Sequence, residues 1–142
     1  MTIQIYFDDV STGQALPVLK KHVTTRQLVQ WAGAAEEFYE LHYDKDFAIT
    51  KGFPGVIVHG QLMASFLAQL MTDWAGDDGS LKKFKVSYLT IVYPGYDLLC
   101  KGTVTKKSIE NGENLVTCEI WMEKEGGEKV LAGEAVASLP KK

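Results

Sequence analysis

Two histidines and an acidic stretch hold the side chains of this chain best suited to proton transfer. Residues 36–42 include Glu37 and end at His42, and an apolar run further on ends in His59-Gly60. An imidazole exchanges protons near neutral pH because its ordinary pKa is about 6.5. A backbone N–H at the amino end of a helix favours negative charge. Together these residues predict an acid/base centre beside an oxyanion hole, acting on a carbonyl compound.

Composition places the chain among ordinary globular proteins. Its 142 residues, 46% hydrophobic and 23% charged, predict one domain over residues 1–142 that buries a core without disulfides. The net charge of −3 argues against a nucleic-acid binder held by phosphate contacts, so no nucleic-acid partner is expected.

The cysteines and the apolar stretches indicate in which cellular compartment the protein is expected. Cys100 and Cys118 are too few for a zinc site and lie in alternating segments, which predicts buried free thiols in a reducing cytoplasm and no metal. Residues 1–9 have neither a basic start nor an apolar core, so no signal peptide is expected. The longest apolar stretch, residues 62–71, is too short for a bilayer, so no membrane partner is expected.

The helices that must position these side chains are predicted from apolar spacing. Residues 60–74 give the clearest pattern, with large apolar side chains three and four apart and small residues elsewhere, which indicates a buried helix. A first strand is expected over residues 18–24. Thr24 or Thr25 then caps a helix that runs through residue 32. A further short helix is expected over residues 44–51.

Alternating segments follow the long helix. Strands are predicted over residues 81–91, 98–105, 115–122 and 130–139, with Asn111-Gly112 as the best hairpin turn. One buried helix followed by a four-stranded antiparallel meander implies an α+β domain, a single hot-dog domain whose antiparallel sheet wraps around one long central helix. The edge and broad surface of such a sheet usually pair in a dimer.

Several segments together resemble a known family. Glu-Phe-Tyr-Glu-Leu-His ends at His42, Val-Ile-Val-His-Gly ends at Gly60, and the chain closes with Gly-Glu-Ala-Val over residues 133–136 and Leu139-Pro140. These segments are similar to those of the MaoC-like acyl-CoA dehydratases and (R)-specific enoyl-CoA hydratases, which are hot-dog proteins. The resemblance covers nearly the whole chain.

The resemblance assigns roles, and the chain also departs from it. His42 matches the catalytic histidine of the family, and Gly60 matches the glycine whose N–H holds the thioester oxygen. The catalytic aspartate falls on Glu37, and the asparagine and proline between the pair fall on Tyr39 and Glu40. The extra methylene of Glu37 moves its carboxylate, and a misplacement of about 1 Å can cost on the order of a hundredfold in rate.

Other residues have both a functional and a structural interpretation. Glu37 is either an active carboxylate or a solvated loop charge, and Tyr39 binds the substrate or packs the loop closed. His59 binds the substrate or fixes the loop that enters the helix. Met63 belongs to the core or lines an acyl pocket, and Ser65 stands one turn before the position of a serine found in some relatives, which is alanine here.

The resemblance implies reversible hydration of an enoyl thioester, with His42 and Glu37 as the acid/base pair. It implies no cofactor, since coenzyme A enters as part of the substrate, and the thioester is carried on coenzyme A or acyl carrier protein. A homodimer is expected, with a higher oligomer or heteromer as alternatives. Two other functions stay open: a non-catalytic acyl-CoA-binding subunit of a hot-dog heteromer, and an acyl-CoA thioesterase.

Overall fold

The computed structural model describes residues 3–142, so residues 1 and 2 of the predicted domain lie outside the described part. The helices are α1 (Thr25–Ala35), α2 (Lys45–Thr50) and α3 (Gly60–Ala75), with short 3-10 turns η1 (Phe7–Asp9) and η2 (Glu40–His42). The strands are β1 (Leu19–His22), β2 (Ser80–Tyr88), β3 (Asp97–Glu110), β4 (Glu113–Lys124) and β5 (Lys129–Ser138). Every predicted helix and strand is present, with ends shifted by a few residues.

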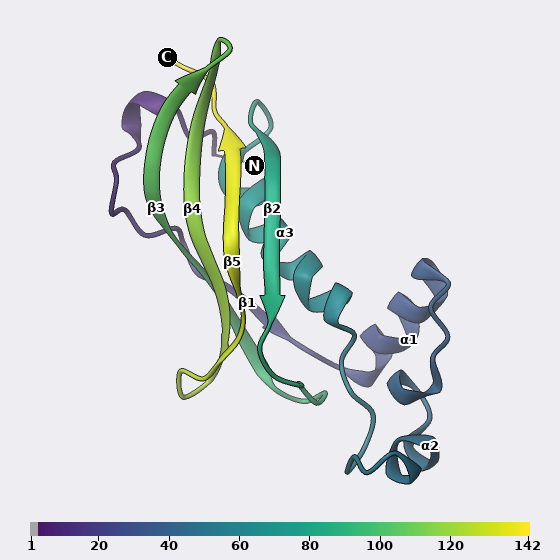
Figure 1. Ribbon diagram of the computed structural model, residues 1–142. Coiled ribbons are helices and arrows are strands. Elements are labelled where there is room, and N and C mark those ends of the chain that lie inside the picture. Colours follow the sequence, from purple (N-terminus) through teal and green to yellow (C-terminus); the bar gives the residue numbers. More distant parts are fainter. Residues whose placement is uncertain (1–2) are drawn as a thin grey trace.

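The strands form one antiparallel sheet in the order β1-β3-β4-β5-β2, curled around α3 (Figure 1). The predicted four-stranded meander is wrong in its order. Strands β3, β4 and β5 are successive hairpin partners, but β2 pairs with β5 and not with β3, and β1 adds a fifth strand beside β3. Alternation shows that a segment can be a strand with one buried face, but it does not show which strand lies beside it.

The hairpin between β3 and β4 follows from its turn residues. Asn111 and Gly112 have φ of 51° and 78°, both in the left-handed region, and connect the paired residues Glu110 and Glu113. Two successive residues with positive φ are typical of the two-residue turn that matches the twist of a hairpin. The prediction of this turn is therefore confirmed.

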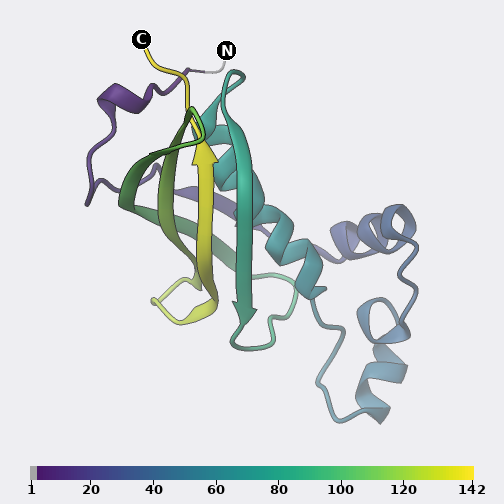
Figure 2. The same cartoon turned by 45° about the horizontal axis from the view of Figure 1, so that its top comes forward.

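Helix α3 fills the concave face of the sheet (Figure 2). Its large apolar side chains are buried, and inward-facing side chains of the strands pack against them in one core. The small side chains on its other face, including Ala64, Ser65 and Ala68, are only half-buried. The prediction of a buried helix is therefore correct for the large apolar side chains of α3 but not for this face. Burial of large apolar side chains is the dominant favourable contribution to folding. The buried side chains of α3 therefore hold the helix in place in the core, and with it the residues at its amino end.

Both cysteines lie in this core. Burial raises the pKa of Cys100 and of Cys118 to about 12, and both are free thiols. Neither is a thiolate near neutral pH, so neither is a nucleophile. The prediction of buried free thiols is confirmed.

Helices α1 and α2 lie together beyond the amino end of α3, away from most of the sheet (Figures 1 and 2). Thr24 caps α1 through a capping box with Gln27, and Asp44 caps α2 by accepting a hydrogen bond from the Phe47 N–H. These caps satisfy backbone donors that the first helical turn leaves free. The segment between the two helices carries Glu37 and His42. Within residues 3–142, no helix is long and apolar enough to cross a membrane.

Candidate active site

Glu37 is placed by the way α1 ends. Glu36 takes a left-handed conformation with φ of 53°, and its N–H and that of Glu37 both donate to the Ala32 carbonyl. Such a left-handed residue satisfies the last carbonyls of a helix and turns the chain away from its axis. The turn directs the chain from α1 toward η2 and leaves Glu37 with a side chain 40% exposed.

His42 is held by the segment that leads into α3. The N–H of Ile57 donates to the Leu41 carbonyl, and Nδ1 of His42 lies 2.9 Å from the Ile57 carbonyl oxygen. A carbonyl oxygen only accepts, so Nδ1 carries a proton and Nε2 is left as the atom that exchanges one. The residue is 8% exposed, and its ring orientation is therefore fixed by burial and by this bond.

Three side chains converge between α1, η2 and the start of α3. One carboxylate oxygen of Glu37, Oε1, lies 3.4 Å from Nε2 of His42, and the other, Oε2, lies 3.8 Å from Nε2 of His59. The two imidazole rings are stacked, with centroids 3.8 Å apart and planes inclined by 20°. The carboxylate thus faces both imidazoles across one small volume, as an acid/base centre requires.

The environment of His59 keeps that imidazole neutral. It is 1% exposed, and burial lowers its pKa below the ordinary histidine value. The neighbouring His42 lowers this pKa further, and the carboxylate of Glu37 raises it by a smaller amount. Two stacked imidazoles do not both accept a positive charge readily, since like charges at this distance repel.

Two histidines and a carboxylate are also possible metal ligands. The ligand atoms of Glu37, His42 and His59 all lie within 4.8 Å of one another. A metal ion needs nitrogen lone pairs that converge on one point about 2 Å away. The two rings are stacked and nearly parallel, which is not the converging arrangement of ligands around a bound ion. The expectation that the chain has no metal centre stays a prediction.

Gly60 begins α3 directly after His59. The first N–H groups of a helix have no partner within it, so the backbone here offers donors to an oxygen of negative character. The aromatic ring of Tyr88, at the end of β2, lies against Gly60, and a Cβ at this position would be 2.8 Å from the nearest ring carbon. Only glycine fits here without movement of that ring.

A cavity of about 480 Å³ opens beside His42. Most of its wall is apolar and comes from four separate segments: Thr25, Val29, Tyr43, Lys45, Pro54, Gly55, Val56, Tyr93 and Pro94. A largely apolar wall with a few polar side chains, His42 among them, is typical of a small-molecule site. The exposed part of His42 can therefore meet a bound molecule.

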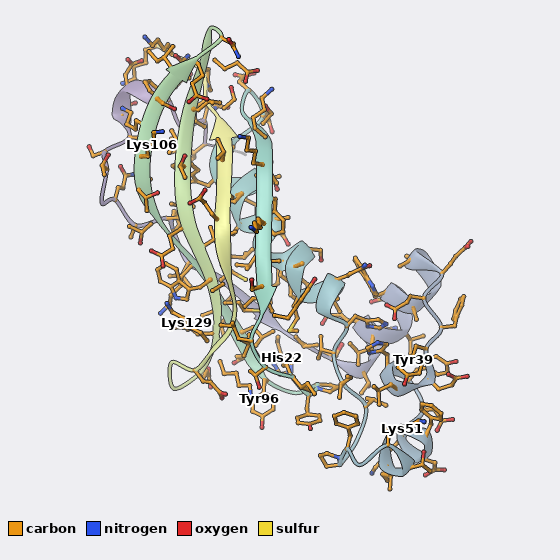
Figure 3. The ribbon with its side chains drawn as sticks, in the orientation of Figure 1. His22, Tyr39, Lys51, Tyr96, Lys106 and Lys129 are labelled. Atoms are coloured by element: carbon orange, nitrogen blue, oxygen red, sulfur yellow. The ribbon has the colours of Figure 1, made fainter. Side chains whose placement is uncertain are left out.

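The other predicted site residues lie at different distances from this centre. Tyr39 packs edge-on against His42, with ring centroids 6.1 Å apart, and Figure 3 shows it in the part of the molecule formed by α1 and α2. Ser65 donates its hydroxyl to the Leu62 carbonyl within α3, and Met63 is buried in the core. Neither of these two lines the cavity beside His42. Their assignment as substrate-binding residues stays a prediction.

Sequence reasoning missed two parts of the site. The cavity wall formed by Tyr93 and Pro94 follows β2, and no local pattern connects these residues with His42. The ring centroid of Trp31 lies 6.5 Å from that of His59. The sequence predicts only that residue 31 belongs to the helix that runs through residue 32. Both contacts depend on the packing of segments far apart in the sequence.

A comparison with family models places the chain in a known group. Residues 10–123 match the model of the MaoC-like domain, so the chain belongs to the MaoC-like domain family. The chain is 29% identical over 123 residues to the (R)-specific enoyl-CoA hydratase of Aeromonas caviae, covering 86% of this chain and 90% of that protein. It is also 29% identical over 94 residues to the 3-oxo-4,17-pregnadiene-20-carboxyl-CoA hydratase beta subunit of Mycobacterium tuberculosis, covering 66% and 72% of the two proteins.

Solved structures support the same fold. The unliganded R-hydratase PhaJ1 of Pseudomonas aeruginosa superposes with a TM-score of 0.88 at 23% identity, covering 98% of this chain and 88% of that one. The predicted α+β hot-dog fold and the predicted family are confirmed.

Proposed function

We propose that the protein catalyses the reversible hydration of an α,β-unsaturated acyl thioester to the (R)-3-hydroxyacyl thioester. One observation carries this proposal: the carboxylate of Glu37 reaches 3.4 Å from Nε2 of His42, beside the glycine that starts α3. The similarity to the hydratases of Aeromonas caviae and Mycobacterium tuberculosis supports the reaction class.

The chemistry assigns a role to each group. Water adds its oxygen to the β-carbon and loses a proton to the Glu37–His42 pair, while the α-carbon gains a proton from the pair. The proton count of the enzyme is therefore unchanged after one turnover. Negative charge that develops on the thioester oxygen is stabilised by the Gly60 N–H, and one such donor is typically worth about 3–4 kcal/mol of barrier.

Glutamate in place of aspartate is compatible with this role. The extra methylene lengthens the side chain that must face the histidine. The left-handed conformation of Glu36 changes the direction of the loop just before Glu37, which can offset this extra length. The observed 3.4 Å from Glu37 Oε1 to His42 Nε2 is slightly longer than a hydrogen bond, and such distances commonly shorten when substrate binds.

The substrate and partners follow from the cavity and the sheet. The apolar wall of the cavity beside His42 suits a short or medium acyl chain carried on coenzyme A or acyl carrier protein, with no further cofactor. Strand β2 pairs on one side only, with β5, so we propose that its free edge forms a homodimer. Two buried free thiols suit a cytoplasmic location.

A second function is a non-catalytic subunit that pairs with an active hot-dog partner. One observation favours it: a relative of this chain is named as a beta subunit. Glu40 and Tyr39 also replace the proline and asparagine of the family pattern. In that case the isolated chain would bind acyl thioester without converting it.

Turnover by the isolated protein separates these functions. We expect purified protein to hydrate short and medium trans-2-enoyl-CoA substrates, followed as the loss of enoyl absorbance, with (R)-3-hydroxyacyl-CoA as the product by chiral chromatography. A thiol reagent monitors free coenzyme A in parallel, and its release from saturated acyl-CoA would indicate a thioesterase. Absence of turnover across all chain lengths would exclude the hydratase proposal for the isolated chain.

Gly60→Ala tests the role of the helix amino end. We expect kcat/KM for hydration to fall at least about tenfold, because the added methyl group occupies the approach to the N–H. Tyr88 is 54% exposed, so its ring can move aside, and thermal stability should change little. The matched control is Tyr88→Ala combined with Gly60→Ala. If the double variant regains full activity, the loss came from the collision with the ring and not from the site.

A further inference from the structure

Three buried side-chain nitrogens among the described residues have no hydrogen-bond partner: Nε1 of Trp31 and both ring nitrogens of His59. The two residues are neighbours, with ring centroids 6.5 Å apart. Buried polar atoms in native proteins nearly always have partners, and each exception calls for an explanation. That all three belong to two adjacent rings behind the proposed acid/base pair points to one common cause.

The donor and acceptor capacities of the two rings complement each other. The indole Nε1–H of Trp31 only donates, and neutral His59 offers one donor and one acceptor. If Nδ1 of His59 accepts from Trp31 through one bridging water, Nε2 of His59 must carry the proton. That Nε2 faces Oε2 of Glu37 at 3.8 Å, a distance that a small movement closes to a hydrogen bond. This single tautomer gives all three nitrogens a partner.

We propose that His59 is a positioning residue for Glu37. As a neutral imidazole whose proton is on Nε2, it donates to Oε2 of Glu37 and so directs Oε1 toward Nε2 of His42. Trp31 fixes the tautomer by donating toward Nδ1. This inference rests on the proposed function, because its consequence is the orientation of the carboxylate in the acid/base pair.

The length of the Glu37 side chain fits this arrangement. Its two carboxylate oxygens face two different imidazoles, at 3.4 Å for His42 and 3.8 Å for His59. A longer side chain has more rotational freedom, and a second hydrogen bond restricts it. Aspartate at this position would be one methylene shorter, so from the same backbone its carboxylate would lie further from both rings.

The surroundings of His59 keep it neutral. The titratable groups that face it are Glu37, from the loop after α1, and His42, from η2; Tyr88 of β2 packs against the adjacent Gly60. Burial and His42 lower the pKa of His59. A neutral donor holds the carboxylate without placing a positive charge beside His42.

Two amide substitutions test which nitrogen matters. The amide nitrogen of glutamine can occupy the place of Nε2, and that of asparagine the place of Nδ1. We expect His59→Gln to stay within about threefold of the wild-type kcat, and His59→Asn to lose at least about tenfold with KM little changed. Thermal unfolding of both variants controls for folding. Equal losses in the two variants would overturn the proposal.

A double-mutant cycle with Glu37→Asp tests whether His59 acts through Glu37. The aspartate restores the family pattern and, from the same backbone, draws the carboxylate away from His59 by one methylene. We therefore expect His59→Asn to lower kcat less than about twofold in the Glu37→Asp background, although it costs at least about tenfold in the wild type. A purely structural role for His59 predicts the same loss in both backgrounds, and that result would refute the inference.

Imidazole ¹⁵N NMR gives a readout that does not depend on activity. We expect His59 to show the signature of the neutral tautomer with its proton on Nε2 above about pH 7, since burial and His42 hold its pKa below the ordinary histidine value. Trp31→Phe removes the donor to Nδ1 and should mix the two tautomers. A proton on Nδ1 of wild-type His59 would contradict the proposal whether or not the protein is a hydratase. Lack of turnover together with the expected tautomer would contradict only the function.

Discussion

Replacing His42 by asparagine is expected to lower kcat/KM for enoyl-thioester hydration about 10³-fold, within the range usual for a general acid or base. This corresponds to about 4 kcal/mol of transition-state stabilisation. The asparagine amide can still donate to the Ile57 carbonyl in place of Nδ1, so the bond that holds the loop is kept. Only the group at Nε2, which faces Glu37, is removed. Steady-state kinetics over a series of enoyl-CoA substrates measures the effect.

A second histidine provides the matched control. His22 lies on β1 at an exposed position, with Nδ1 2.7 Å from Asp97, and Figure 3 shows it away from Tyr39 and the site around it. His22→Asn should leave kcat/KM unchanged. Thermal unfolding of both variants should agree with the wild type to within about 1 kcal/mol, since each removes at most one hydrogen bond. If His42→Asn kept full activity in a folded protein, the acid/base pair would be wrongly assigned.

The candidate site combines local sequence patterns with contacts between distant segments, and only the local patterns could be recognised from the sequence. The His-Gly pair at the helix start and the histidine in an acidic stretch are local patterns that could be recognised before the structure. The roles of Glu37 and His42 came from the resemblance to the family, in which the catalytic aspartate stands five residues before the histidine. The stacking of His42 on His59 joins segments 17 residues apart. It depends on the hydrogen bond from the Ile57 N–H to the Leu41 carbonyl and on that from Nδ1 of His42 to the Ile57 carbonyl. No periodicity encodes such a contact, and the same limit applies to Trp31 and the cavity wall.

For the fold as well, local elements could be predicted from the sequence, but the pairing of distant strands could not. Helix α3 was predicted within one residue of its end because large apolar side chains at helical spacing dominate its burial. Alternation likewise predicted β2 as a strand. Its partner β5 lies about 50 residues further along the chain, and alternation within β2 carries no information about which strand lies beside it.

Gly133 lies where the backbones of β2 and β5 pack closely together. Its substitution is expected to have the largest effect on stability of all the changes that we propose. It lies in β5 opposite Val86 of β2. A Cβ at Gly133 would overlap the Lys85 carbonyl oxygen and lie 2.8 Å from Cα of Val86. Both obstacles are backbone atoms, so no side chain can turn aside to make room.

Gly133→Ala must therefore displace β2 from β5, and it is expected to destabilise the protein by at least about 3 kcal/mol, in the range that only a backbone or core disruption reaches. Chemical denaturation followed by circular dichroism measures the change. The control is the same substitution at Gly33, which is exposed in α1 and whose added Cβ would meet nothing within 4 Å. Gly33→Ala should stabilise by about 0.5–1 kcal/mol, because alanine is the better helix former.

The same displacement should reach the site, because β2 ends at Tyr88 and the ring of Tyr88 packs against Gly60. Gly133→Ala protein that remains folded at low temperature is thus expected to lose hydratase activity as well, although residue 133 belongs to neither the acid/base pair nor the cavity wall. If the free energy of unfolding of Gly133→Ala stayed within about 0.5 kcal/mol of the wild-type value, β2 would move freely against β5. Strand β2 could then not hold Tyr88 against the start of α3.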